Sequence, residues 1–263
     1  MWLRISGGIT RTVGVLAIFL QPSTVAHARV ATASPEKSLS QVPFVGCRSV
    51  GQAGPLEAPR GKSKAVPITA DLAERLAYYK AEQGRGVLAP RGWYCFETYG
   101  SSGGNLYVAP QPIDPEAVFS EAWPGFAGPA IQLSGIDGGT SGRFGVAHII
   151  ARVFPAHRAF VRRIMNEGID SPSSFHFGPY PQDQLTYKTK EIVEYETPAN
   201  AEGLGTNSRL KRDDSPIRGV AILLGPSSEP SLSLLSARLP PNLSSLTAII
   251  IQQVELDVAE ADQ

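Results

Sequence analysis

The chain has 263 residues, and 24 lysines and arginines balance 24 aspartates and glutamates, so its formal net charge is zero. This balance argues against a nucleic-acid-binding protein, because no basic excess is available to neutralise phosphates. It also argues against a polybasic membrane-surface protein. A hydrophobic fraction of 42% is ordinary for a globular chain of one domain or two small ones.

The first 28 residues have the pattern of a secretory signal peptide. Arg4 and Arg11 give a positive start, an apolar run follows at 13–20, and Ala26-His27-Ala28 has the small-x-small pattern that signal peptidase needs. We therefore expect cleavage near Ala28, with Ala31-Thr32-Ala33 as a second possible position and an uncleaved anchor as the competing interpretation.

The rest of the chain is expected to be exported, to the periplasm or outside the cell. Eight apolar residues are too few to span a bilayer, which takes ~20, and no later stretch is longer. Without the first 28 residues the chain has 22 basic and 24 acidic side chains, so the argument against nucleic acid still holds.

Export changes the interpretation of the two cysteines, Cys47 and Cys95. Outside the cytosol an even pair of cysteines is usually a disulfide, and we predict that these two are joined. Phe44-Val45-Gly46-Cys47 faintly resembles a lipoprotein box, but its apolar run lies far upstream. Two isolated cysteines also lack the paired spacing of a zinc site.

The first half of the remaining chain is expected to contain one strand, a helix and a hairpin. In chain order, the patterns predict a disordered linker at 29–41, a strand at 42–47, an irregular loop at 51–64, a helix from Asp71 through Tyr79 toward Gly84, and a hairpin of 93–99 with 105–109.

The second half mixes strands and helices without strict alternation. The patterns predict a short helix at 114–122, strands at 130–133 and 144–154, a helix from Pro155 to Gly168, a loop to Gln184, an edge strand at 191–196, a hairpin of 219–224 with 232–239, and a final helix capped by Asn242. We therefore predict an α+β fold, with a mainly antiparallel sheet and three or so helices, in a single globular domain at 42–258.

A possible nucleophile lies in Gly100-Ser101-Ser102-Gly103-Gly104, which matches the G-x-S-x-G pattern of hydrolases. Ser102, Asp137 and His148 have the chain order of a catalytic triad, although His157 and His176 fit as well. That chemistry requires a turn from strand into helix, whereas the residues after Gly104 resemble a strand. A flexible hairpin turn is the competing interpretation.

No metal or cofactor site is expected. The histidines after the signal peptide do not form H-E-x-x-H, and the glycine-rich segment after Asp137 supplies too few carboxylates for calcium. Gly61-Lys62-Ser63 lacks the leading glycine of a phosphate loop, because position 56 is Leu56.

The most distinctive candidate surface is the segment from Arg91 to Tyr99, in which an arginine adjoins aromatic residues. Arg91, Trp93 and Tyr99 could stack on a planar or sugar ligand and pair with its carboxylate. In the alternative interpretation Trp93, Tyr94 and Phe96 pack the hairpin around the cysteine bridge.

The motif Val87-Leu88-Ala89-Pro90-Arg91-Gly92-Trp93-Tyr94-Cys95 resembles one in a family of uncharacterised exported bacterial proteins. The segments 44–47, 99–103 and 197–206 match the same pattern, so the resemblance covers most of residues 42–256. The family has Trp-His-Cys where this chain has Trp93-Tyr94-Cys95. The resemblance implies a bacterial envelope setting and no known activity.

Two functions therefore remain open from the sequence. The first is an exported, non-catalytic domain that binds an envelope ligand or protein partner through the Arg91–Tyr99 segment. The second is a secreted serine hydrolase that uses Ser102.

Overall fold

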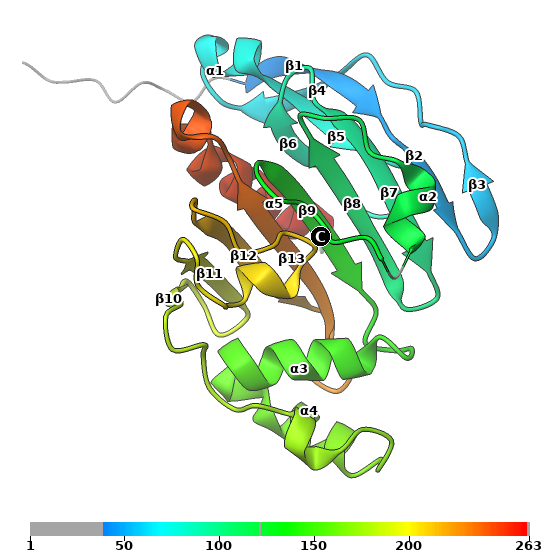
Figure 1. The fold of residues 1–263 in the computed structure, drawn as a ribbon, viewed down its shortest axis with the longest axis vertical. Helices are drawn as coiled ribbons and strands as arrows, with labels where there is room; N and C mark the ends of the chain where they lie inside the picture. Colours follow the sequence, from blue (N-terminus) through cyan, green and yellow to red (C-terminus); the bar gives the residue numbers. More distant parts are fainter. Residues whose placement is uncertain (1–38, 121, 262–263) are drawn as a thin grey trace, which may run out of the picture. The chain divides into compact units, whose positions relative to one another are not determined.

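The computed structural model describes residues 39–120 and 122–261, which belong to one compact unit of the chain (Figure 1). These residues form two β-sheets and five α-helices, and most strand pairs are antiparallel. The predicted α+β class is confirmed. The predicted signal peptide lies outside the described residues, as does the predicted linker up to its last three residues, 39–41, which belong to the first strand.

The larger sheet crosses the whole described unit. Its nine strands, all within the described residues, have the spatial order β10 (Gln184–Tyr187), β11 (Ile192–Thr197), β12 (Ile217–Leu224), β13 (Ser231–Arg238), β9 (Ala130–Ile136), β8 (Gly103–Ala109), β7 (Tyr94–Gly100), β2 (Arg48–Gly51) and β3 (Gly54–Leu56). Neighbours are antiparallel except β2 and β7, which are parallel.

The smaller sheet has the order β4 (Ser63–Pro67), β1 (Leu39–Gly46), β5 (Leu76–Lys80) and β6 (Val87–Pro90). The helices are α1 (Ala70–Arg75), α2 (Pro115–Phe119), α3 (Arg143–Val153), α4 (Arg158–Met165) and α5 (Thr247–Ala261). Short 3₁₀ turns lie at Pro155–His157, Pro172–Ser174, Gly205–Asn207 and Pro241–Leu246.

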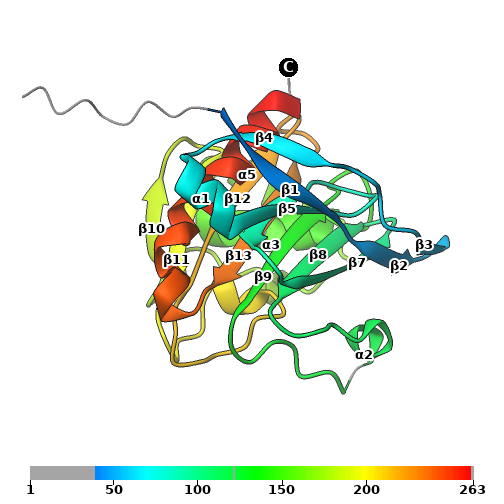
Figure 2. The same ribbon diagram turned by 90° about the horizontal axis from the view of Figure 1, so that it is seen from above.

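Both faces of the larger sheet are covered. Because successive side chains of a strand point to opposite faces, Leu235 and Ala237 of β13 join a core with the smaller sheet and α5. Leu232 and Leu234 of the same strand join a second core with α3 and α4. In Figure 2, β1, β4 and α5 lie above the larger sheet and α2 lies below it.

A buried polar network joins the smaller sheet to α5. The hydroxyl of Tyr78 donates a hydrogen bond of 2.7 Å to Asp257 Oδ2, and Gln253 Nε2 donates one of 2.8 Å to Oδ1. Lys64 Nζ lies 3.3 Å from the same Oδ1. Burial and the neighbouring carboxylate raise the pKa of Tyr78. Each polar group therefore has a partner, as burial requires.

The predicted helix from Asp71 toward Gly84 is wrong in its second half. It ends at Arg75, and β5 begins at Leu76 and pairs with both β1 and β6. Leu76 to Tyr79 are all buried, which suits a central strand with two covered faces rather than an amphipathic helix. Pairing with β1, which is distant in sequence, therefore overrides the local helical pattern.

The predicted strand at 144–154 is also wrong, since this segment is α3. Its buried residues include Val146, Ile149, Ile150 and Val153, which have helical spacing and pack against the larger sheet. A run this apolar has no clear period, so the sequence did not distinguish a buried strand from a buried helix.

The loop predicted at 51–64 contains β3 and the start of β4, and Asn242, predicted to cap the final helix, lies in the 3₁₀ turn before α5. The remaining predicted elements agree with the structure apart from small shifts at their ends. Both hairpins form, as β7 with β8 and β12 with β13, and the last two helices are α4 and α5. The strand predicted to lie at the edge of the sheet, β11, is instead paired with β10, and β10 is the edge strand. No helix among the described residues is long and apolar enough to cross a membrane.

The disulfide between Cys47 and Cys95 is confirmed. Cys47 is buried and stands between β1 of the smaller sheet and β2 of the larger one, and Cys95 lies in β7. The bond therefore fastens the crossover between the two sheets to the strand that pairs with β2.

Replacing both cysteines by serine should lower the free energy of unfolding. The bond joins residues 48 positions apart, and closing such a loop restricts the unfolded chain by about 4 kcal/mol. Urea unfolding of the oxidised protein and of the double variant measures the difference. Equal midpoints, or free thiols in denatured, non-reduced wild-type protein, would contradict this prediction.

Candidate functional site

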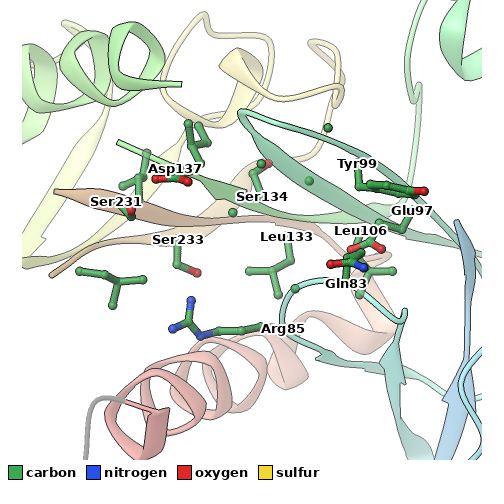
Figure 3. A pocket seen from close by; sticks show the side chains of 18 residues that line it. Gln83, Arg85, Glu97, Tyr99, Leu106, Leu133, Ser134, Asp137, Ser231 and Ser233 are labelled. Carbon is green, nitrogen blue, oxygen red and sulfur yellow. The ribbon is translucent and has the colours of Figure 1, made fainter. Parts of the chain in front are cut away.

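A cavity of about 290 Å³ lies on the face of the larger sheet that also carries the smaller sheet (Figure 3). Its floor is formed by β7, β8, β9 and β13, and the loop between β5 and β6, residues 81–86, forms one wall. We call this cavity the Glu97 pocket.

Two rows of paired residues form the floor. Glu97 stands opposite Leu106, which stands opposite Leu133. The next row on the same face runs from Tyr99 through Gly104 and Gly135 to Ser233. The first row therefore places the acid Glu97 beside two leucines. The second row places the Tyr99 ring and the Ser233 hydroxyl at its two ends, with the bare backbone of two glycines between them.

The two floor glycines leave room for a ligand. A Cβ atom added at Gly135 would meet no atom within 4 Å, so the space above this residue is open. A Cβ atom at Gly104 would lie 3.1 Å from the backbone oxygen of Thr98, a tight contact, and 3.6 Å from Glu97 Oε1. A flat ring can approach such a floor more closely than one that carries side chains.

Glu97 is the chemically unusual residue of the pocket. It is 2% exposed, and its Oε2 atom has no hydrogen-bond partner among the described residues. Burial raises the pKa of its carboxyl to about 7, although a backbone hydrogen bond from Gln83 and the charge of Lys80 oppose the shift. The pocket therefore holds an acid that takes up or releases a proton near neutral pH.

Arg85 and Tyr99 complete the polar part of the wall. Arg85 Nε is buried and lacks a hydrogen-bond partner within the described ranges. The Tyr99 hydroxyl donates a hydrogen bond of 2.7 Å to the backbone oxygen of Gly54, so this residue offers the pocket its ring. The pocket thus combines an unpaired acceptor, an unpaired donor and an aromatic surface.

Asp137 lines the far end of the same pocket. Leu133 of β9 lies in the same row as Glu97 of β7, two strands away, and Asp137 follows Leu133 by four residues along the chain. Strand geometry then places the two Cα atoms ~16 Å apart. Asp137 Oδ1 already accepts a hydrogen bond of 2.9 Å from the backbone of Gly139. The two carboxyls therefore do not form the close pair of a retaining glycosidase.

The structure brings together only part of the predicted triad. Ser102 lies in the turn between β7 and β8, and its backbone oxygen accepts a hydrogen bond of 3.0 Å from the backbone of Asp137. His148 belongs to α3, lies 3.4 Å from Asp170, and stacks on Phe175. Within the described chain, no side-chain contact joins the serine, the acid and the histidine.

The other two histidines lie elsewhere. His157 Nε2 is 3.8 Å from a carboxylate oxygen of Glu191, and His176 lines the same cavity as His148. In residues 39–120 and 122–261, no three His, Cys, Asp or Glu side chains are grouped so that they could hold a metal ion.

The predicted ligand-binding residues, Arg91, Trp93 and Tyr99, do not lie together in one site. Arg91 Nη2 donates a hydrogen bond of 2.9 Å to the backbone oxygen of Ala73, and Trp93 packs on the core of the smaller sheet. Tyr99 lines the Glu97 pocket. The packing interpretation fits Trp93 and the buried Phe96, whereas Tyr94 is 51% exposed.

Sequence reasoning missed Glu97, Arg85 and the floor glycines. One signal was available, because Glu97 lies between Cys95 and Tyr99 at alternate positions of a predicted strand. If Cys95 faces inward to form its bridge, then Glu97 faces inward too, and a charged residue on a buried face is informative. Arg85 and Gly135 are distant in sequence and carry no such signal.

No protein-family model, curated protein or solved structure matches the chain.

The stability of the protein should depend on the protonation of Glu97. Its folded pKa of about 7 lies above the ordinary value of 4.5, so between these values the folded state binds more protons than the unfolded state. The free energy of unfolding should then fall by about 3 kcal/mol as the pH rises from 4.5 to above 7. Urea unfolding at pH 5 and pH 8 measures the change.

The matched variants for this experiment are Glu97→Gln and Glu82→Gln. Glu82 is exposed in the loop 81–86, so Glu82→Gln should keep the loss of stability between pH 5 and pH 8. Glu97→Gln should remove most of it. A wild-type loss that survives in Glu97→Gln would show that another group is responsible.

A fluorophosphonate probe should not label Ser102, because its hydroxyl contacts no base in residues 39–120 or 122–261 that could activate it. Mass spectrometry of the treated protein is the measurement, with a known serine hydrolase as the positive control. Labelling that Ser102→Ala abolishes would instead support the hydrolase.

Proposed function

We propose that the protein is an exported, non-catalytic domain of the bacterial envelope that binds one sugar ring of a glycan in the Glu97 pocket. The observation that carries this proposal is the buried carboxyl of Glu97, whose Oε2 has no partner among the described residues and whose Oε1 lies beside Gly104, at the edge of the open space above Gly135. An unpaired buried acceptor is costly, and a donor from a ligand offsets that cost.

A sugar ring has the chemistry that the pocket offers. Its hydroxyls can donate to Glu97 and accept from Arg85, and its C–H face can lie on the backbone of Gly104 and Gly135 beside the Tyr99 ring. Leu106 and Leu133 give the apolar contact that most small-molecule sites have. A volume of about 290 Å³ is at the low end for such sites and suits a single ring.

The disulfide and the signal-like first 28 residues support the exported setting. Disulfides persist in oxidising compartments and are rare in the cytosol. The resemblance of the 87–95 motif to exported bacterial proteins agrees with this setting and adds no activity.

Binding is favoured over catalysis by the separation of the acids. Sugar hydrolysis needs two carboxyls close to one bond, whereas Asp137 is ~16 Å along the floor from Glu97 and is bonded to Gly139. The contacts of Ser102 and His148 likewise do not favour the serine hydrolase.

The test is titration of the protein with N-acetylglucosamine, glucose and galactose, monitored by calorimetry or by NMR. At about 0.3 kcal/mol per non-hydrogen atom, a single ring of this size should bind with a Kd near 1 mM. Gly135→Val should abolish binding, because its side chain would enter the open space above the floor. Glu97→Leu should abolish it by removing the acceptor.

The control variant is Glu82→Leu, which makes the same substitution at an exposed position of the adjoining loop and should bind like the wild type. Thermal unfolding verifies that each variant is folded. The proposal is wrong if no sugar binds the wild-type protein, or if folded Gly135→Val binds as well as the wild type.

A further inference from the structure

The opposite face of the same strands carries a second group of polar side chains. Residues that alternate with those of the Glu97 pocket floor point the other way, and among them are Thr98, Asn105, Gln132 and Ser134. Cavities of about 480 Å³ and 460 Å³ lie on this face.

The two cavities adjoin, because both are lined by Asn105, Gln132, Asn207 and Ser208. We call the joined space the groove. One end is bounded by α3 and the loop 174–180, and the other by α2 and residues 209–211. The two joined volumes fit a chain of several rings better than a single ring.

The floor of the groove is a hydrogen-bonded network where a covered sheet face would normally be apolar. Gln132 and Ser134 are buried, and both donate to Asn105 Oδ1, at 3.1 Å and 2.7 Å. Gln132 Oε1 accepts a hydrogen bond of 2.7 Å from the backbone of Arg209. Asn105 Oδ1 is thus satisfied, and its Nδ2 group has no partner in the part of the chain that the structure describes. The floor therefore offers a donor.

The walls carry positive charge at both ends. Arg152 lines one cavity, and Arg209 and Lys211 line the other, while neither lining includes an Asp or Glu. The guanidinium of Arg152 lies 4.1 Å from the centre of the Tyr180 ring, and that of Arg209 lies 5.6 Å from the Trp123 ring. None of the three cations forms an ion pair within the described residues.

Two acids near this face, Asp170 and Asp183, are already bonded. Asp170 contacts His148, and the carboxylate of Asp183 accepts hydrogen bonds from Thr197 and from the backbone of Leu204. Arg152 Nη1 donates a hydrogen bond of 3.4 Å to the backbone oxygen of Gly178, and the charge of Arg152 acts on Asp183 without forming an ion pair in the described chain. A planar guanidinium with no direct carboxylate contact is well suited to bind a carboxylate from a ligand.

We propose that the groove binds an acidic oligosaccharide, whose carboxylates pair with Arg152 at one end and Arg209 at the other while its hydroxyls bond the Asn105 floor. This site is separate from the Glu97 pocket and lies on the opposite face of the strands. Its test uses a different probe, so either proposal can fail alone.

The experiment compares trigalacturonate with maltotriose, a neutral chain of the same number of rings, by calorimetry at low ionic strength. Trigalacturonate should bind at least about tenfold more tightly than maltotriose, because each charge-assisted hydrogen bond adds about a factor of ten. Added salt should weaken trigalacturonate binding.

The variants Arg152→Gln and Arg209→Gln should each weaken trigalacturonate binding by about tenfold or more. Arg152→Lys, which keeps the charge without the planar fork, should lose less than Arg152→Gln. Arg212→Gln is the matched control, because Arg212 is exposed beside Lys211 but is paired with Glu202 outside the groove. Thermal unfolding verifies that each variant is folded.

Three results would overturn the proposal. The first is equal affinity for trigalacturonate and maltotriose, or no binding of trigalacturonate at all. The second is unchanged affinity in both folded glutamine variants. The third is binding of poly(glycerol phosphate) without binding of trigalacturonate, which would assign the groove to a phosphate polymer.

Discussion

The bond between Cys47 and Cys95 holds the point on which the two-sheet arrangement depends. The chain leaves the smaller sheet at Gly46 and enters the larger one at Arg48, and Cys47 stands between them. Because Cys95 is in β7, the bond fixes this crossover against the strand that also carries Glu97 on the same face. The disulfide at Cys95, two residues from Glu97, therefore holds Glu97 in position without giving its carboxyl a hydrogen-bond partner.

The structure contains several buried charged side chains, and they differ in the partners that offset their burial. Arg238 is 1% exposed and its Nε has no hydrogen-bond partner among the described residues, but its Nη2 donates to the backbone oxygen of Lys211 and its Nη1 lies 3.1 Å from Asp213. Asp257 receives hydrogen bonds from Tyr78 and Gln253. These groups stabilise the packing of the elements that they join. Glu97 has an unpaired oxygen and a raised pKa, so its ionised form weakens the fold. Such a residue is better explained by a ligand than by packing.

A sheet with both faces covered should be apolar on both sides, and the exceptions mark the two proposed sites. On one face Glu97 lies beside a row of residues that is bare backbone at Gly104 and Gly135. On the other face, Asn105 and Gln132 replace apolar residues beneath a groove with cations at both ends. Successive side chains of a strand point to opposite faces, so β8 and β9 contribute to both sites. One site holds an acid and the other is bounded by cations.

The sequence by itself determined the features that depend on neighbouring residues or on simple counting. Local turns and alternation predicted the β7–β8 and β12–β13 hairpins, amphipathic spacing predicted α4, and an even pair of cysteines predicted the disulfide. Tertiary structure decided that Leu76 begins a strand, because its pairing with β1 and β6 comes from distant segments. It also decided that 143–153 is a helix, since a nearly continuous apolar run has no clear period. The Glu97 pocket belongs to the same class: Arg85, Glu97 and Gly135 meet only because strand pairing and the loop 81–86 bring three distant segments to one place.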